Sequence, residues 1–188
     1  MKNRPKGFSL IELLVVVAIV AILAALATPS FNTMLVRRAV QGAAGALVSD
    51  LRFARSEAVR RSAQVSICAL AANSSNTCSG APANWATGWM VFVDPSDSGT
   101  RGVRDGTEEI LRVQQPLPNI ATVQQLLVPS NTLLYIPFEA SGWARANSNQ
   151  TFAFTPTGTV PAGTVRIVCV SLQGRVRMLV EGATACSS

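Results

Sequence analysis

The sequence contains no histidine, only one tyrosine, and lysine only at positions 2 and 6. Without histidine, the chain can form neither a Ser-His or Cys-His catalytic pair nor a metal site with imidazole ligands. Charged residues make up 14% of the 188 residues, which is too few for a disordered polyelectrolyte. The composition therefore argues against most classes of enzyme. The length fits one domain, or a small domain with an appendage.

Apolar residues are abundant and unevenly placed: they form 48% of the chain, and the mean hydropathy is +0.31. The run from Phe8 to Thr28, FSLIELLVVVAIVAILAALAT, contains a single charge, Glu12. As a helix this run is roughly 30 Å long, which matches the hydrocarbon core of a bilayer. The run is preceded by Lys2, Arg4 and Lys6, which should stay cytoplasmic. We therefore predict a transmembrane helix over residues 8–28, with the rest of the chain on the far side.

Two simpler interpretations of this run are a secretory signal peptide and a plain membrane anchor. Ala25-Leu26-Ala27 could be a cleavage site, but the run exceeds the roughly 7–15 apolar residues of a signal peptide. A plain anchor leaves Glu12 unexplained, since a carboxylate at the centre of a lipid-facing helix costs about 2.5–3.5 kcal/mol. Glu12 is therefore a functional candidate that needs a partner.

The segment Lys6-Gly7 followed by FSLIELLV resembles the prepilin motif of type IV pilins and type II secretion pseudopilins. The resemblance implies that a prepilin peptidase cuts between Gly7 and Phe8 and that the new amine of Phe8 is methylated. Glu12 would then meet the Phe8 amine of a neighbouring subunit, which offsets part of both desolvation costs and sets the axial register of the filament. Loss of the leader, residues 1–7, would leave arginine as the only basic residue type.

After the apolar run, the pattern stays helical to about Arg61. Pro29 should kink the helix. Apolar residues then recur at intervals of three and four, namely Phe31, Leu35, Ala39, Ala43, Ala46, Leu47, Leu51, Ala54 and Ala58. We predict one long kinked helix from Phe8 to about Arg61, whose second half, residues 29–61, is amphipathic and packs on a globular head.

Residues 62–188 consist of short β-prone runs divided by turn residues, which predicts a β-rich head. The candidate strands are 64–70, 88–94, 109–114, 121–128, 133–138, 151–155, 164–171 and 175–181. We expect an antiparallel sheet packed on the helix, an α+β arrangement. Together with the N-terminal motif, this arrangement resembles the type IV pilin fold.

Two further stretches resemble the H-type pseudopilin and minor pilin group, which includes GspH, FimT and FimU-like proteins. They are residues 50–61, DLRFARSEAVRR, and residues 85–94, WATGWMVFVD, followed by Asp105 and residues 108–112. We interpret Trp85, Trp89 and Phe92 as core residues.

The resemblance implies a minor type IV pilin, a non-enzymatic structural subunit that joins or primes a pilus used in twitching motility, adhesion or DNA uptake. The alternative is an H-type minor pseudopilin that acts in type II protein export. The implied partners are other pilins, the prepilin peptidase and the inner membrane, with DNA as a further candidate. The implied location is a single-pass inner-membrane protein with a periplasmic head, later part of the pilus at the cell surface.

The four cysteines, at positions 68, 78, 169 and 186, permit three pairings. We favour Cys68–Cys78, which closes a Ser/Asn-rich loop, and Cys169–Cys186, which ties the C-terminus to a strand. The second spacing resembles minor pilins, whereas pseudopilins of this group usually lack it. A zinc site formed by four thiolates is the alternative, and the absence of a close C-x-x-C pair counts against it.

An acidic loop is a weaker candidate, with carboxylates at Asp94, Asp97, Asp105, Glu108 and Glu109. Their spacing is not that of a twelve-residue calcium-binding loop, and arginines at positions 101 and 104 offset much of the charge. We expect a solvated loop without metal or cofactor.

The segment Gly174-Arg175-Val176-Arg177 is the main candidate for ligand binding. On a strand, Arg175 and Arg177 share one face, while Val176, Met178 and Val180 share the other. Arg166 on the preceding strand could join the two arginines as a phosphate-binding group. The segment resembles the Gly-Arg-x-Arg element of FimT-type pilins that bind DNA. The simpler interpretation is a solubilising strand face.

Overall fold

A computed structural model describes residues 7–79, 85–95, 100–126, 134–145 and 149–180. The chain divides into two compact units, Met1–Leu35 and Val36–Ser188. Helix α1, Leu10–Arg61, contributes to both units and is continuous through position 29. The predicted helix is therefore present, but it begins two residues later than expected, because Ser9 caps it rather than belonging to it.

The C-terminal end of α1 is fixed by a backbone turn. The amide of Ser62 donates to the carbonyl of Val59, and the amide of Ala63 donates to the carbonyl of Ala58. Ser62 adopts a left-handed conformation, with φ of 51°. This pair of hydrogen bonds is the Schellman motif, which satisfies carbonyls that the helix leaves without partners. The helix therefore ends at Arg61, as the sequence predicts.

Eight strands follow α1, and the first and last residue of each lie within two residues of the predicted boundaries. They are β1 (Val65–Ala69), β2 (Trp89–Val93), β3 (Ile110–Gln114), β4 (Ile120–Leu126), β5 (Tyr135–Phe138), β6 (Gln150–Pro156), β7 (Arg166–Val170) and β8 (Val176–Val180). A short 3₁₀ helix, η1 (Trp85–Thr87), which the sequence analysis did not predict, precedes β2.

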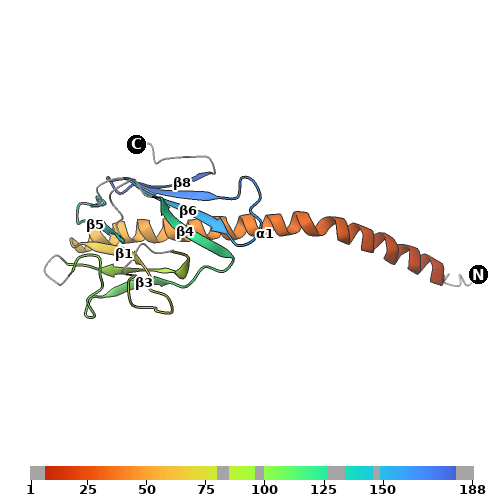
Figure 1. Ribbon diagram of the computed structural model, residues 1–188, viewed down its shortest axis with the longest axis horizontal. Helices are drawn as coiled ribbons and strands as arrows, with labels where there is room; N and C mark the ends of the chain where they lie inside the picture. Colours follow the sequence, from red (N-terminus) through yellow and green to blue (C-terminus); the bar gives the residue numbers. More distant parts are fainter. Residues whose placement is uncertain (1–6, 80–84, 96–99, 127–133, 146–148, 181–188) are drawn as a thin grey trace, which may run out of the picture. The chain divides into compact units, whose positions relative to one another are not determined.

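The strands form two four-stranded antiparallel sheets (Figure 1), with orders β3-β2-β1-β5 and β4-β6-β7-β8, so the predicted antiparallel α+β arrangement is confirmed. The strands divide into two sheets because β5 pairs with β1, whereas β4, which comes before β5 in the chain, pairs with β6. Such long-range pairing is not encoded in the local alternation of apolar and polar residues.

The main core lies between α1 and both sheets. The helix contributes mostly small side chains at intervals of three and four, which lets the sheets approach closely. The residues are Val40, Ala43, Ala44, Leu47, Val48, Leu51, Ala54 and Ala58. Trp85, Trp89 and Phe92 are fully buried, which confirms their interpretation as core residues. The ring of Trp85 meets that of Phe152 edge-on, with centroids 4.9 Å apart.

A second, smaller core covers the other face of β1 and β2. Along β2, Trp89 and Val91 face the main core, whereas Met90 and Phe92 face the smaller one. The disulfide Cys68–Cys78 lies in this smaller core, which confirms that predicted pairing. The other predicted pair, Cys169–Cys186, cannot be followed, since Cys186 lies outside the described residues.

Candidate functional site

The first candidate site is the start of α1, where Ser9 and Glu12 cap the helix reciprocally. The amide and hydroxyl of Ser9 both donate to Oε2 of Glu12, at 2.9 and 3.0 Å. In return, the amide of Glu12 donates to Oγ of Ser9 at 3.3 Å. This is a capping box, in which the first residue before the helix and the third helical residue satisfy each other's amides. This capping box was not predicted above, although Ser-x-x-Glu before an apolar run is its sequence signature.

The apolar side chains that follow this cap are exposed. Phe8 is 85% exposed, and large apolar residues from Leu10 to Leu23 are between half and four-fifths exposed. Within the part of the chain that the structure describes, no helix combines the length and hydropathy of a membrane span. A helix that exposes apolar side chains on every face is stable in water only when something covers it.

The second candidate site is the segment 174–177. Arg175 precedes β8, Arg177 lies within it, and both are exposed, whereas Val176 between them is buried. No hydrogen bond or ion pair of either guanidinium group is found among the described residues. The two arginines therefore present the exposed, unpaired charges that the sequence predicts.

The prediction that Arg166 joins these two arginines was wrong. Arg166 pairs in register with Val180, whereas Arg177 pairs with Cys169. Directly paired residues share a face, so Arg166 and Arg177 lie on opposite faces of the sheet. Arg166 instead donates through Nη1 to the carbonyls of Gly163 and Val165. Met178 and Val180 share the face of Val176, as predicted, but they are 36% and 67% exposed, and β8 is an edge strand.

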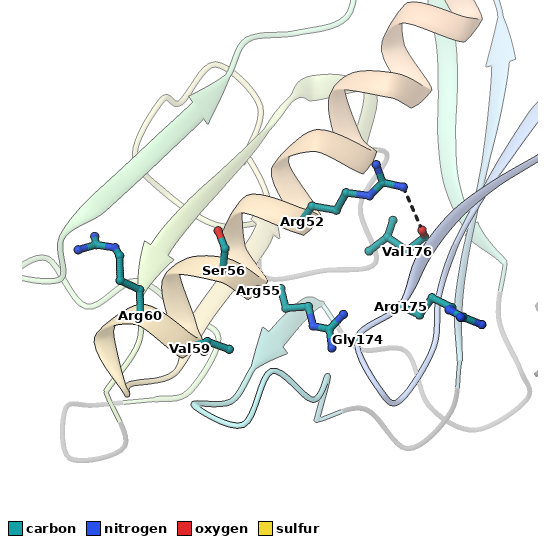
Figure 2. A pocket seen from close by; sticks show the side chains of 8 residues that line it. All are labelled: Arg52, Arg55, Ser56, Val59, Arg60, Gly174, Arg175 and Val176. Atoms are coloured by element: carbon teal, nitrogen blue, oxygen red, sulfur yellow. Dashed lines mark hydrogen bonds between the residues drawn. The ribbon is translucent and has the colours of Figure 1, made fainter.

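Residues 174–176 of this segment border an open groove with a volume of about 670 Å³. The other wall is the C-terminal part of α1, and the whole groove lies within the unit that begins at Val36. Its lining residues are Arg52, Arg55, Ser56, Val59, Arg60, Gly174, Arg175 and Val176. Figure 2 shows Arg52 projecting from α1 toward Val176 and Arg55 projecting toward the turn that carries Gly174, while the Arg175 side chain extends away from Arg55.

The geometry at Gly174 explains why a glycine precedes the arginine pair. Gly174 has a φ of +73°, and a Cβ there would lie 2.2 Å from the carbonyl oxygen of Gly142 and 3.0 Å from Nε of Arg55. Only glycine fits such an approach without displacing a neighbour. Gly174 therefore allows two turns to close around the Arg55 side chain.

The arginines of α1 are held by backbone carbonyls. Nε of Arg55 donates to the carbonyl of Gly142 at 2.9 Å, and Nη2 of Arg52 donates to the carbonyl of Val176 at 3.4 Å (Figure 2). Neither residue was a sequence candidate. Their spacing of three places them on one helix face, and that signal could have identified them.

At the rim of the groove, Arg60 is neutralised by an ion pair with Glu57, which also pairs with Arg61. Hydrogen bonds from Arg60 and then Arg61 lower the pKa of the Glu57 carboxyl to about 2. Arg61 also binds Glu109, and that hydrogen bond lowers the pKa of the Glu109 carboxyl. The end of α1 is therefore linked to the start of β3 by charged groups.

Carboxylates of the acidic loop accept hydrogen bonds from other groups of the head. Oδ2 of the buried Asp94 accepts hydrogen bonds from Gln64, Ser66 and the amide of Gly102. A carboxylate oxygen of Glu108 accepts from the amide of Asp105. Asp97 lies outside the described residues, and among the described ones no group of three acidic or cysteine side chains is arranged to hold a metal ion.

An exposed apolar helix that follows a glycine, together with an α+β head of two antiparallel sheets, defines the class of pilin-like filament subunits. The family described as type II transport protein GspH matches residues 43–183, and the prokaryotic N-terminal methylation motif matches residues 2–28. The chain therefore belongs to the GspH family, whose members are structural pilin and pseudopilin subunits rather than enzymes.

Individual relatives agree with this assignment. The type IV major fimbrial protein FimA of Dichelobacter nodosus is 33% identical over 127 residues, which cover 66% of this chain and 68% of FimA. Other fimbrial proteins of that organism are 50% identical over 50 residues. These residues cover 27% of this chain and only 30% of the length of those proteins. The crystal structure of the type IV minor pilin FimU of Pseudomonas aeruginosa superposes with a TM-score of 0.54 and 26% identity, covering 76% of this chain and 90% of FimU. The chain has the type IV pilin fold.

Proposed function

We propose that this protein is a minor type IV pilin that joins a pilus, or primes its assembly, through its N-terminal helix. The observation that carries the proposal is the apolar surface of α1 from Leu10 to Leu23, which is exposed on every face and needs a cover. Before assembly, lipid would cover residues 8–28 of a single-pass inner-membrane protein, with the leader in the cytoplasm and the head in the periplasm. After assembly, the helices of neighbouring subunits would replace the lipid.

Processing would separate residues 1–7 from the mature chain. A prepilin peptidase would cut between Gly7 and Phe8 and methylate the Phe8 amine. A Gly7→Leu variant should accumulate as the uncut precursor, which mass spectrometry distinguishes from the mature chain. Normal cleavage of this variant would contradict the leader assignment.

Glu12 would bind the Phe8 amine of the next subunit and so fix the axial register. A Glu12→Ala variant should insert into the inner membrane normally but appear at reduced levels in sheared pili, as measured by immunoblotting of both fractions. Equal levels of the variant and the wild type in sheared pili would overturn the role of Glu12.

The alternative is an H-type minor pseudopilin of a type II secretion system. The cysteine at position 186, in addition to Cys169, favours the pilin, since the resemblance links that spacing to minor pilins. Deletion of the gene should abolish twitching motility and surface pili without reducing protein export. Loss of export with normal pili would favour the pseudopilin.

A second candidate function is the capture of DNA by the head. The exposed guanidinium groups of Arg175 and Arg177, which have no partner among the described residues, favour it. The full chain in non-ionic detergent should retard a short DNA duplex in a native gel, and the Arg175→Gln, Arg177→Gln double variant should not. A double variant that binds like the wild type would overturn the role of these two residues.

A further inference from the structure

The groove between α1 and segment 174–176 contains guanidinium groups with unused hydrogen-bond donors. Arg52 and Arg55 each use one nitrogen to bind a backbone carbonyl, of Val176 and of Gly142 respectively. A guanidinium group has five N–H donors in a planar fork, so most of the donors of each group have no partner among the described residues. The hydrogen bonds to these carbonyls also hold the two side chains in place. Less side-chain conformational entropy is therefore lost when a ligand binds.

Within the described part of the chain, the positive charge of this groove is largely uncompensated. None of the described lining residues carries a carboxylate, and among them only Arg60 has an ion-pair partner in the described chain, Glu57, which lies outside the groove. Arg52, Arg55 and Arg175 therefore remain as three cations from two different elements around one open groove. Such a group attracts a multiply charged anion with planar, bidentate acceptor groups.

The exposed arginines extend beyond the groove lining. Arg177 is exposed two residues further along the chain, on the face of β8 opposite Val176, and it also has no partner among the described residues. A single small anion would need only the groove, whereas a polymer of phosphates can leave the groove and pass around the edge strand β8 to reach Arg177. An extended track of this kind fits a nucleic-acid backbone better than an isolated phosphate.

We propose that the groove binds the phosphodiester backbone of DNA, with Arg52 and Arg55 as binding residues that act together with Arg175. The inference rests on the DNA capture proposed above and deepens it, because it moves the centre of the site from the Gly-Arg-x-Arg segment to the face of α1. Contacts of this kind reach phosphates rather than base edges, so binding should be independent of sequence.

The test uses the full chain in non-ionic detergent and the fluorescence anisotropy of a short labelled DNA duplex at several salt concentrations. An Arg52→Gln, Arg55→Gln double variant should bind on the order of tenfold more weakly at low salt. The slope of log affinity against log salt should also fall by about two, since each lost phosphate contact removes about 0.9 from it. The Arg52→Lys, Arg55→Lys variant should keep the slope but lose part of the affinity, because lysine retains the charge without the fork.

The matched control is the Arg37→Gln, Arg38→Gln double variant. It removes the same charge from the same helix, outside the groove, and Arg37 also donates to a carbonyl, that of Ala162 at 3.1 Å. Binding by this variant should stay within about twofold of wild type, and thermal unfolding should confirm that both double variants are folded. Equal losses in the two double variants would overturn the proposal, because they would reflect net charge alone.

Two further outcomes separate the inference from the proposal on which it rests. If the wild type binds DNA and the Arg52→Gln, Arg55→Gln variant binds equally well, the groove is not the site, whereas DNA capture stands. If the wild type does not bind DNA, DNA capture itself fails. Polyglutamate serves as a competitor, and its displacement of the duplex at equal charge concentration would overturn the proposal in favour of an acidic protein partner.

Discussion

The indole Nε1 of Trp89 donates a hydrogen bond to Oδ2 of Asp50 at 2.9 Å, and both side chains are buried. The other carboxylate oxygen accepts from Nη1 of Arg112 at 3.0 Å, and the guanidinium carbon of Arg112 lies 3.7 Å from the centroid of the Phe53 ring. A single carboxylate of α1 thus joins the helix to β2 and β3. These four residues fall in the stretches that resemble the H-type group, and their shared role is to fix the sheet on the helix.

Removal of this carboxylate should destabilise the head strongly. An Asp50→Ala variant leaves the buried indole N–H without a partner and Arg112 without its counter-charge. We expect a loss of about 2–4 kcal/mol in the free energy of unfolding, measured by thermal unfolding with near-ultraviolet circular dichroism. The matched control is Glu139→Ala, which removes only an exposed ion pair with Arg145 at 3.7 Å. That change should cost less than about 1 kcal/mol. Equal losses would show that the Asp50 contacts contribute little.

The charged cluster at the end of α1, formed by Glu57, Arg60, Arg61 and Glu109, should make the stability of the head depend on pH in the acidic range. Because the pKa of Glu57 is lowered to about 2 in the folded state, its contribution is complete above the unfolded pKa of about 4.3. The contribution is lost as pH falls from there toward 2. The melting temperature of a Glu57→Gln variant should therefore lie below that of the wild type at pH 7, and the two should converge near pH 2. A constant difference across this range would contradict the assignment of the shift to Glu57.

The capping box allows the two roles of Glu12 to be separated. A Ser9→Ala variant removes the hydroxyl from the cap, at a cost of about 1 kcal/mol to the start of the helix, but it leaves the Glu12 carboxylate for a neighbouring amine. We expect Ser9→Ala to appear in sheared pili at nearly normal levels, unlike Glu12→Ala. Equal reductions for the two variants would show that Glu12 acts mainly as a helix cap.

The close approach at Gly174 can be tested against a glycine of the same conformation. Gly174 and Gly163 both have φ of +73°, but a Cβ at Gly163 would meet no atom within 4 Å. A Gly163→Ala change should cost about 1 kcal/mol from backbone strain alone. Gly174→Ala should cost about 1–3 kcal/mol more, because the new methyl group must displace the Gly142 carbonyl. Chemical denaturation of the two variants measures both values, and equal costs would contradict the steric role of Gly174.

Local sequence patterns predicted the elements of the head well, because each element has a local cause. The spacing of small apolar residues from Ala43 to Ala58 marked the buried face of α1, and turn residues marked the ends of all eight strands. The pairing of Cys68 with Cys78 was also predictable, since the two residues flank one short loop. The division of the strands into two sheets was not predictable, because it depends on pairings such as Val65 with Phe138.

The arginine groove was only partly predictable for the same reason. Gly174 and Arg175 stood out as a short motif, but Arg55 joins them only through the fold, which brings residues more than eighty positions apart into contact. Arg166 was misplaced because strand register, rather than proximity in sequence, decides which face a side chain occupies. The capping box was missed although its signature is local, because Glu12 was considered only as a partner for another subunit.

The order of strands along the chain also governs how the head acquires its structure. Strand β4 belongs to the second sheet, yet the chain passes through it before β5 returns to complete the first sheet. Neither sheet is therefore a contiguous stretch of sequence, and neither can close before part of the other has been synthesised. The two halves should fold and unfold in one cooperative step, at a rate limited by the closure of long loops. Cleavage between β4 and β5 would accordingly leave neither fragment with a complete sheet, because it separates β5 from β1 and β4 from β6.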